Sequence, residues 1–145
     1  MFDITWEFSF WDVIIILAVV LIIILVIAYL VKRRPPEEID IQKIKKKWQE
    51  IEELIKKDNE AMWRVAIIEA DKLLDFVLKG LVMPGQTMGE RLKVACAKHE
   101  RLRQVWWAHK LRNNIVHEHD YKLRRGEARK AIRSFERALK TLRVL

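Results

Sequence analysis

The stretch VIIILAVVLIIILVIAYLV, residues 13–31, contains nineteen consecutive apolar residues and no charge. At about 1.5 Å of rise per residue, a helix of this length spans roughly 28 Å, close to the thickness of the hydrocarbon core of a bilayer. A soluble core helix seldom contains so long an uninterrupted run. The sequence therefore predicts a single transmembrane helix over residues 13–31, preceded by a short extracytoplasmic segment over residues 1–12.

The charges on either side of this run predict its orientation. Residues 1–12 carry three acidic side chains and no basic one, whereas Lys32, Arg33 and Arg34 follow the run directly. Because Lys and Arg next to a span stay on the cytoplasmic side, we expect the N-terminus outside and the C-terminal region in the cytoplasm, at the inner or plasma membrane. A cleaved leader is the alternative, but it would begin with a positive region and end in small residues.

Every lysine and arginine lies after the apolar run. Residues 1–12 therefore carry a charge of −3 and the rest of the chain a charge of +11, which together give the net charge of +8. The densest basic segment is residues 122–143, with nine basic residues against Glu127 and Glu136. Such a field suits a polyanion, either nucleic acid or the anionic cytoplasmic leaflet, and charge alone does not choose between them. The single cysteine, Cys96, excludes an intrachain disulfide and is expected to be a small buried hydrophobic residue.

Beyond a basic, proline-containing linker over residues 32–39, the periodicity predicts an all-α bundle over residues 40–145. Apolar residues recur at spacings of three and four from Ile41 to Ile55, and Asn59 is placed to cap the next helix. The first helix of the bundle is expected to end before Asp58. Further helices are expected over about residues 60–81, 88–97, 100–116 and 125–142. The fold class expected is therefore one transmembrane helix followed by a cytoplasmic bundle of four or five helices.

The stretch HKLRNNIVHEHDY, residues 109–121, is polar where a packing helix should be apolar. One explanation is a helix end at which His117 and the asparagines satisfy the last carbonyls. The other is a site in which Arg112 binds phosphate and His117 exchanges a proton with the 2′-hydroxyl of RNA. The spacing alone favours the cap. On one ideal helix the heads of Arg112 and His117 do not meet, but a helix that ends near Val116, or a second copy of the helix across a two-fold axis, could bring them together.

The context of this stretch favours the site. The sequence AHKLRNNIVHEHD, with AIIEADKLLDFVL before it and GEARKAIRSFERALKTL after it, resembles the HEPN superfamily. The hallmark of that superfamily is Arg-x4-6-His at the end of a bundle helix, with a polar residue after the arginine. The resemblance covers about residues 40–143. It implies a bundle that forms a homodimer by pairing two motif helices, and in many members a metal-independent endoribonuclease.

Carried over by position, the resemblance implies that His117 is the general acid and base, Arg112 the phosphate clamp and Asn113 an orienting residue. Accessory candidates are Glu118, His119 and His109, although His109 also suits a packed, hydrogen-bonded role. His119 stands where some toxin members have a tyrosine, two positions after the histidine. The pair His117-x-His119 is half a metal site without a third ligand, so no metal and no cofactor are expected.

Three functions remain open on the sequence. The first is a membrane-anchored, homodimeric HEPN-like ribonuclease. The second is a non-catalytic module that holds a nucleotide, RNA or an unidentified partner protein at the membrane. The third is a structural bitopic protein whose basic last helix contacts anionic lipid.

Two further expectations concern side chains outside the motif. Glu69 and Asp71 are expected to be solvated or ion-paired, because the polar face of their helix must carry charges. Of Trp106 and Trp107, which point about 100° apart on a helix, one is expected in the core and the other as a dimer anchor.

Overall fold

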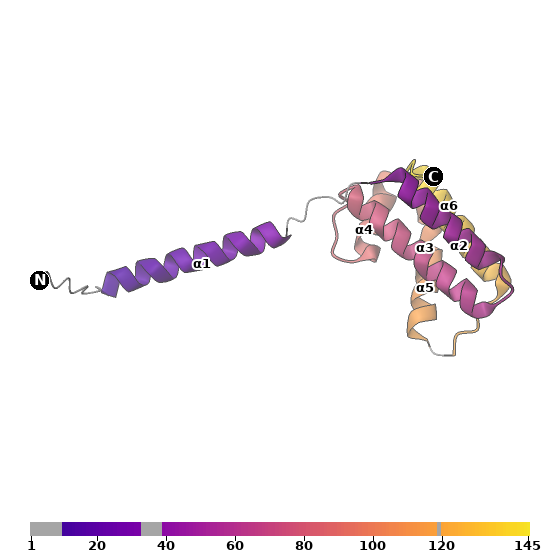
Figure 1. The fold of residues 1–145 in the computed structure, drawn as a ribbon, viewed down its shortest axis with the longest axis horizontal. Helices are drawn as coiled ribbons and strands as arrows, with labels where there is room; N and C mark the ends of the chain where they lie inside the picture. Colours follow the sequence, from indigo (N-terminus) through magenta and orange to yellow (C-terminus); the bar gives the residue numbers. More distant parts are fainter. Residues whose placement is uncertain (1–9, 33–38, 119) are drawn as a thin grey trace, which may run out of the picture. The chain divides into compact units, whose positions relative to one another are not determined.

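A computed structural model describes residues 10–32, 39–118 and 120–145, with the side chains of the first range described up to residue 27. Within these ranges the chain forms six α-helices and one short 3-10 helix, and no strand, which confirms the all-α prediction. The chain divides into two compact units, Met1–Pro35 and Pro36–Leu145. Figure 1 shows the helices of each unit, and each is described by itself below.

The first unit contains helix α1, Phe10–Lys32, which includes the predicted span. Among the described helices, α1 is the one long and apolar enough to cross a membrane. A helix that is apolar on all sides suits an apolar surrounding rather than a water-facing surface. Of the expected membrane-flanking residues, Lys32 ends α1 and its side chain is not described, while Arg33 and Arg34 lie outside the described residues.

The second unit is a helical bundle that begins with α2, Ile41–Lys56, and α3, Glu60–Gly80. Both helices start at side-chain caps: Asp40 accepts hydrogen bonds from backbone N–H groups of α2, and Asn59 does the same for α3. Helix α3 packs against α2, α4, α5 and α6, so it forms the centre of the bundle (Figure 1). The bundle core is drawn from residues 44–144 alone.

Helix α4, Met88–Lys98, is capped by the side chain of Thr87 and is followed by η1, Glu100–Gln104, and α5, Val105–His117. The prediction of one helix over residues 100–116 was therefore wrong in its first turn, which is a tighter 3-10 helix. The backbone of His99 is extended, its carbonyl accepts from the N–H of Leu102, and Leu102 is fully buried. The tighter turn thus buries Leu102 before the α-helix begins.

Helix α6, Arg125–Thr141, closes the bundle by packing on α3, α5 and η1. Its buried face consists of Ala128, Ala131, Ile132, Phe135, Ala138 and Leu139. The two tryptophans of α5 differ as expected: Trp106 is half-buried against the core, whereas 36% of Trp107 is exposed. Cys96 is half-buried rather than fully buried, and this partial burial raises the pKa of its thiol.

Candidate functional site

Asp71, in the middle of α3, is the buried carboxylate around which the polar residues of α5 gather. Only 3% of its surface is exposed, so of the two states expected for it Asp71 has the ion-paired one, but inside the bundle rather than on a polar outer face. The sequence contained a signal for this burial, because Asp71 lies four residues after Ile67 and three before Leu74, which are both fully buried. A carboxylate on this stripe must find partners inside the bundle.

His109 of α5 supplies the first partner. Its Nδ1 lies 2.7 Å from Oδ1 of Asp71, and both side chains are buried. Because a carboxylate accepts hydrogen bonds, Nδ1 carries the proton in this pair. On the other side of the ring, Nε2 lies 3.5 Å from Nδ2 of Asn113. The structure therefore gives His109 the packed, hydrogen-bonded role considered from the sequence, and in addition joins it to two site residues.

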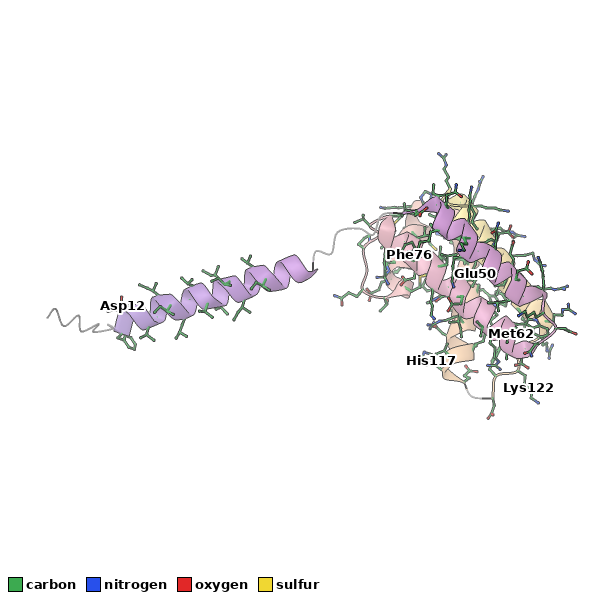
Figure 2. The ribbon with its side chains drawn as sticks, in the orientation of Figure 1. Asp12, Glu50, Met62, Phe76, His117 and Lys122 are labelled. Carbon is green, nitrogen blue, oxygen red and sulfur yellow. The ribbon has the colours of Figure 1, made fainter. Side chains whose placement is uncertain are left out.

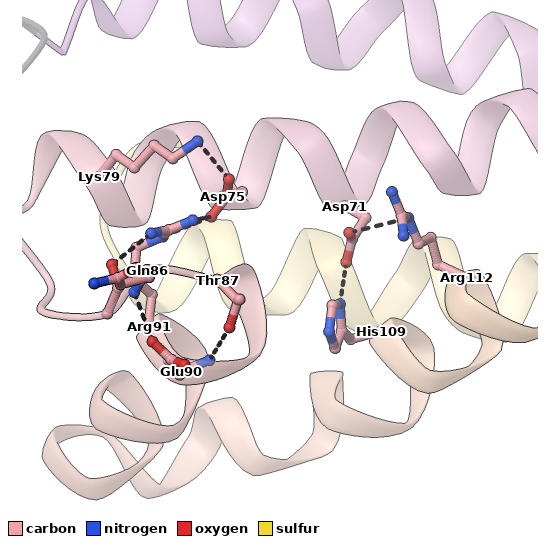
Figure 3. Close-up of polar contacts among 10 residues, drawn as sticks. Asp71, Asp75, Lys79, Gln86, Thr87, Glu90, Arg91, His109 and Arg112 are labelled. Carbon is pink, nitrogen blue, oxygen red and sulfur yellow. Dashed lines mark hydrogen bonds and ion pairs between the residues drawn. The ribbon is translucent and has the colours of Figure 1, made fainter. Parts of the chain in front are cut away.

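Arg112 supplies the second partner of Asp71, as Figure 3 shows. Its Nε lies 3.5 Å from Oδ2 of Asp71, and Nη1 donates to Oδ1 of Asn113 at 3.0 Å. The Nε atom is buried but donates no hydrogen bond, so its contact with Asp71 is an attraction between charges. A guanidinium has five N–H donors, and one of them donates to a described residue of the chain. The Arg112 side chain, 26% exposed, thus retains unused donors.

These residues border a cavity of about 440 Å³. It lies where the middle of α3, the start of α4 and the second half of α5 meet. Its lining is Asp71, Lys72, Asp75, Thr87, Met88, Gly89, His109, Arg112 and Asn113. The sequence predictions named three of these residues as site candidates, His109, Arg112 and Asn113 of α5, and missed the contributions of α3 and α4.

The second carboxylate of the cavity, Asp75, is bound by two cations. Its Oδ1 lies 2.7 Å from both Nε and Nη2 of Arg91, and its Oδ2 lies 2.7 Å from Nζ of Lys79 (Figure 3). The buried Arg91 also donates to the carbonyl of Gly85 at 2.7 Å, which fastens the turn before α4 to α3. The acidic charge of Asp75 is therefore already compensated within the bundle.

Glu69 lies beside this region and is ion-paired, which is one of the two states expected for it. Lys72 lies 2.9 Å and Lys47 3.6 Å from its carboxylate oxygens. The hydrogen bond from Lys72 is the largest cause that lowers the pKa of Glu69. Around the cavity, the carboxylates of Asp71, Asp75 and Glu69 thus face five cationic side chains, and this balance favours an anionic ligand.

His117 is the last residue of α5 and is exposed, as Figure 2 shows at the tip of that helix. Among the described residues its side chain makes no hydrogen bond, and the carbonyl of Asn114 is satisfied by the backbone N–H of Glu118 at 2.8 Å. The side chain of His117 therefore does not act as the helix cap that the sequence offered as the alternative to a site. Within one chain the described contacts do not join His117 to Arg112, and His119 lies outside the described residues.

The segment that follows His117 is held by a clamp that the sequence predictions missed. Glu60, at the start of α3, accepts hydrogen bonds from Arg64 at 2.8 and 3.0 Å and from the backbone N–H of Leu123 at 3.2 Å. Arg64 in turn donates to the carbonyl of Tyr121. The hydrogen bond from Arg64, followed by that from Leu123, lowers the pKa of Glu60. The clamp fixes where the chain returns to the bundle after the motif.

Within the part of the chain that the structure describes, no group of three or more His, Cys, Asp or Glu side chains is arranged to hold a metal ion. Comparison with protein-family models, with curated proteins and with solved structures gave no match for this chain.

Proposed function

We propose that this chain is a membrane-anchored, HEPN-like domain that acts as a homodimeric, metal-independent endoribonuclease. The observation that carries the proposal is the position of Arg112: its guanidinium is held beside the buried Asp71 at the edge of a cavity, and most of its donors remain unused. A fixed arginine with unused donors is suited to bind the oxygens of a phosphodiester in a planar, bidentate manner.

His117 supplies the acid–base chemistry in this proposal. An imidazole ring can accept and donate a proton, so His117 can take the proton from a 2′-hydroxyl as that oxygen attacks the phosphorus. The bond from phosphorus to the 5′ oxygen then breaks, and this oxygen takes a proton from a protonated His117 imidazole, which leaves a cyclic phosphate and a 5′-hydroxyl. Arg112 stabilises the charge that develops on the non-bridging oxygens. Neither role requires a metal ion.

The proposal requires a second copy of the chain, because Arg112 and His117 make no described contact within one copy. Pairing two α5 helices across a two-fold axis would place His117 of one chain near the Arg112 of its partner. Val116, one turn beyond Arg112 on α5, has 46% of its surface exposed. An exposed apolar side chain beside the site supports the proposal that a second copy of the chain covers this face of α5. In this arrangement Asn113 and His109 orient Arg112 rather than contact the reacting atoms.

The anchor in the proposal is α1, with the N-terminus outside the cell and the bundle in the cytoplasm. The length and uniform apolarity of α1 support a span, and the three basic residues after it support the orientation. A cytoplasmic bundle would have direct access to RNA.

The decisive experiment incubates the full chain, in neutral detergent micelles and EDTA, with mixed RNA. We expect the parent to cleave RNA to cyclic-phosphate ends, and His117→Ala to lose this activity. His99→Ala is the matched control, because His99 is also an exposed histidine but lies outside the site. Arg112→Lys keeps the charge opposite Asp71, so it tests the bidentate grip with little risk to folding.

If the parent leaves RNA intact under conditions in which it is folded and dimeric, the ribonuclease proposal is wrong. One observation then favours a non-catalytic binding module. The cavity borders Arg112 on its Asp71 side, while His117 makes no described contact with it. Such a module would bind a nucleotide or RNA phosphate at Arg112 without turnover, and Arg112→Lys would weaken that binding while His117→Ala would not.

A further inference from the structure

Helix α6 presents a continuous row of four arginines to solvent. Arg125, Arg129, Arg133 and Arg137 follow one another at intervals of four residues, and all are exposed. On an α-helix this spacing puts them on one side, about 6 Å apart along the axis. We refer to these four residues as the arginine ridge.

The ridge is not neutralised by acidic residues of its own helix. Glu127 accepts a hydrogen bond from the backbone N–H of Arg124 at the start of α6, and Glu136 pairs with Lys140 at 2.5 Å. Like charges four residues apart oppose helix formation. A row of them without interleaved acids therefore has no local structural benefit.

The ends of the ridge have partners, whereas its middle has none within the described structure. Arg125 lies 3.4 Å from Asp58, and Nη1 of Arg137 donates to Oε1 of Gln104 on η1 at 3.3 Å. For Arg129 and Arg133, the described residues supply neither an ion pair nor a hydrogen bond. The two central guanidinium groups are therefore available to an external anion.

An aromatic side chain borders the ridge. Trp107 of α5 is partly exposed, and Nζ of Lys130 lies 4.5 Å from the centroid of its ring. Because Lys130 directly follows Arg129, the tryptophan lies beside the middle of the ridge. Cations in a row with an adjacent aromatic ring are the combination with which proteins bind single-stranded nucleic acid, the cations at the phosphates and the ring at a base.

We propose that the arginine ridge, with Lys130 and Trp107, binds the sugar–phosphate backbone of single-stranded RNA. The surface is separate from the Arg112 site: Trp107 and Arg112 are five residues apart on α5, which places them about 140° apart around that helix. The inference therefore goes beyond the proposed cleavage and holds whether or not the chain cleaves RNA.

An anionic membrane is the competing partner, and two observations favour RNA over it. The apolar face of α6 is buried in the bundle core, so the helix has no exposed apolar face to insert between lipids. The ridge also consists of arginines alone, whose planar guanidinium groups bind phosphate at two points, whereas attraction to a lipid surface needs only positive charge.

The test measures fluorescence anisotropy of a short, labelled 2′-O-methyl RNA with the full chain in zwitterionic micelles. This probe lacks the free 2′-hydroxyl that the proposed cleavage needs, so the two proposals fail independently. We expect Arg129→Gln/Arg133→Gln to weaken binding about tenfold and to reduce the slope of log K against log salt by about 1.4, because two phosphate contacts are lost. DNA of the same sequence shows whether the sugar contributes.

Two variants control for charge alone. Lys45→Gln/Lys46→Gln removes the same charge from exposed positions on α2, and we expect it to leave the affinity nearly unchanged. Arg129→Lys/Arg133→Lys keeps the charge, and we expect affinity between those of the parent and the Gln variant.

Three outcomes would overturn the inference. The parent could fail to bind the probe, or the ridge variant could bind it as tightly as the α2 variant does. Alternatively, the ridge variant could lose binding to vesicles that contain anionic lipid while its RNA affinity is unchanged, which would assign the ridge to the membrane. Circular dichroism of each variant establishes that the bundle is folded.

Discussion

Asp71 and His109 lie 38 residues apart in the chain, yet Oδ1 of Asp71 accepts a hydrogen bond of 2.7 Å from Nδ1 of His109 inside the bundle. The bond joins α3 to α5 and fixes the orientation of the imidazole ring. Because the other oxygen of Asp71 faces Nε of Arg112, one buried carboxylate orients both polar side chains of the site. The position of Arg112 therefore depends on a residue of a different helix.

Replacing this carboxylate should destabilise the bundle strongly. Asp71→Asn leaves the buried Arg112 Nε without an opposite charge, and breaking such a buried pair costs about 3 kcal/mol of unfolding free energy. Glu69→Gln, two residues earlier on α3, is the control, because its ion pairs are at the surface and are worth less than about 1 kcal/mol. Urea unfolding followed by tryptophan fluorescence measures both. Equal losses would show that Asp71 is not the centre of the network.

A methyl group at Gly85 should disturb the turn before α4. The residue has φ of 144°, and a Cβ there would lie 2.7 Å from the backbone nitrogen of Arg91. We expect Gly85→Ala to lower the unfolding free energy by about 1–3 kcal/mol and to lower Tm. Gly126→Ala is the control, because no atom lies within 4 Å of a Cβ built there. It should leave Tm unchanged or raise it. An unchanged Tm for both variants would contradict the strain argued for Gly85.

The clamp at Glu60 should make stability depend on pH in the acidic range. The hydrogen bonds from Arg64 and Leu123 lower the pKa of Glu60 in the folded state. Its contribution to stability is therefore present above the ordinary pKa of a glutamate and is lost as the pH falls through the lowered value. We expect Glu60→Gln to be less stable than the parent at pH 7 and to approach it in strong acid.

The control for Glu60→Gln is a glutamate that forms no hydrogen bond or ion pair with another helix or loop of the described bundle. Glu53→Gln removes an exposed carboxylate whose partner, Lys56, lies three residues away on the same helix. Thermal unfolding at both pH values should show little change for this variant. If the deficit of Glu60→Gln persisted undiminished below the lowered pKa, its cause would not be the ionised clamp.

Cys96 should react slowly with alkylating reagents. Burial raises the pKa of its thiol, so less of the reactive thiolate is present at neutral pH. We expect iodoacetamide to modify the folded chain more slowly than the chain unfolded in urea at the same pH. The rate of mass gain measures this difference. Equal rates would show that the thiol is as accessible in the bundle as in the unfolded chain.

The proposed orientation predicts the behaviour of reporter fusions at Leu145. A fluorescent protein that folds only in the cytoplasm should be bright there, whereas alkaline phosphatase, which needs an oxidising compartment, should be inactive. Replacing Lys32, Arg33 and Arg34 by Gln should shift the balance toward the opposite orientation. An active phosphatase on the unmodified chain would overturn the cytoplasmic placement of the bundle.

The helices themselves were predictable because their causes are local. Asn59 caps α3 through its own side chain, Thr87 caps α4, and the apolar spacing on α6 marks the face that is buried. Each of these signals acts within one or two helical turns. The 3-10 turn of η1 escaped prediction because the burial of Leu102, rather than any local breaker, accompanies it.

By itself the sequence determined the apolar α1, the all-helical bundle and the polarity of the stretch that contains Arg112 and His117. Only the tertiary structure decided that Asp71 is buried, that it binds His109 and Arg112, and that His117 remains exposed at the end of α5. The physical reason is that periodicity and capping depend on neighbours within a turn. The partner of a buried charge depends instead on which helices pack together, and here α3 packs against α5.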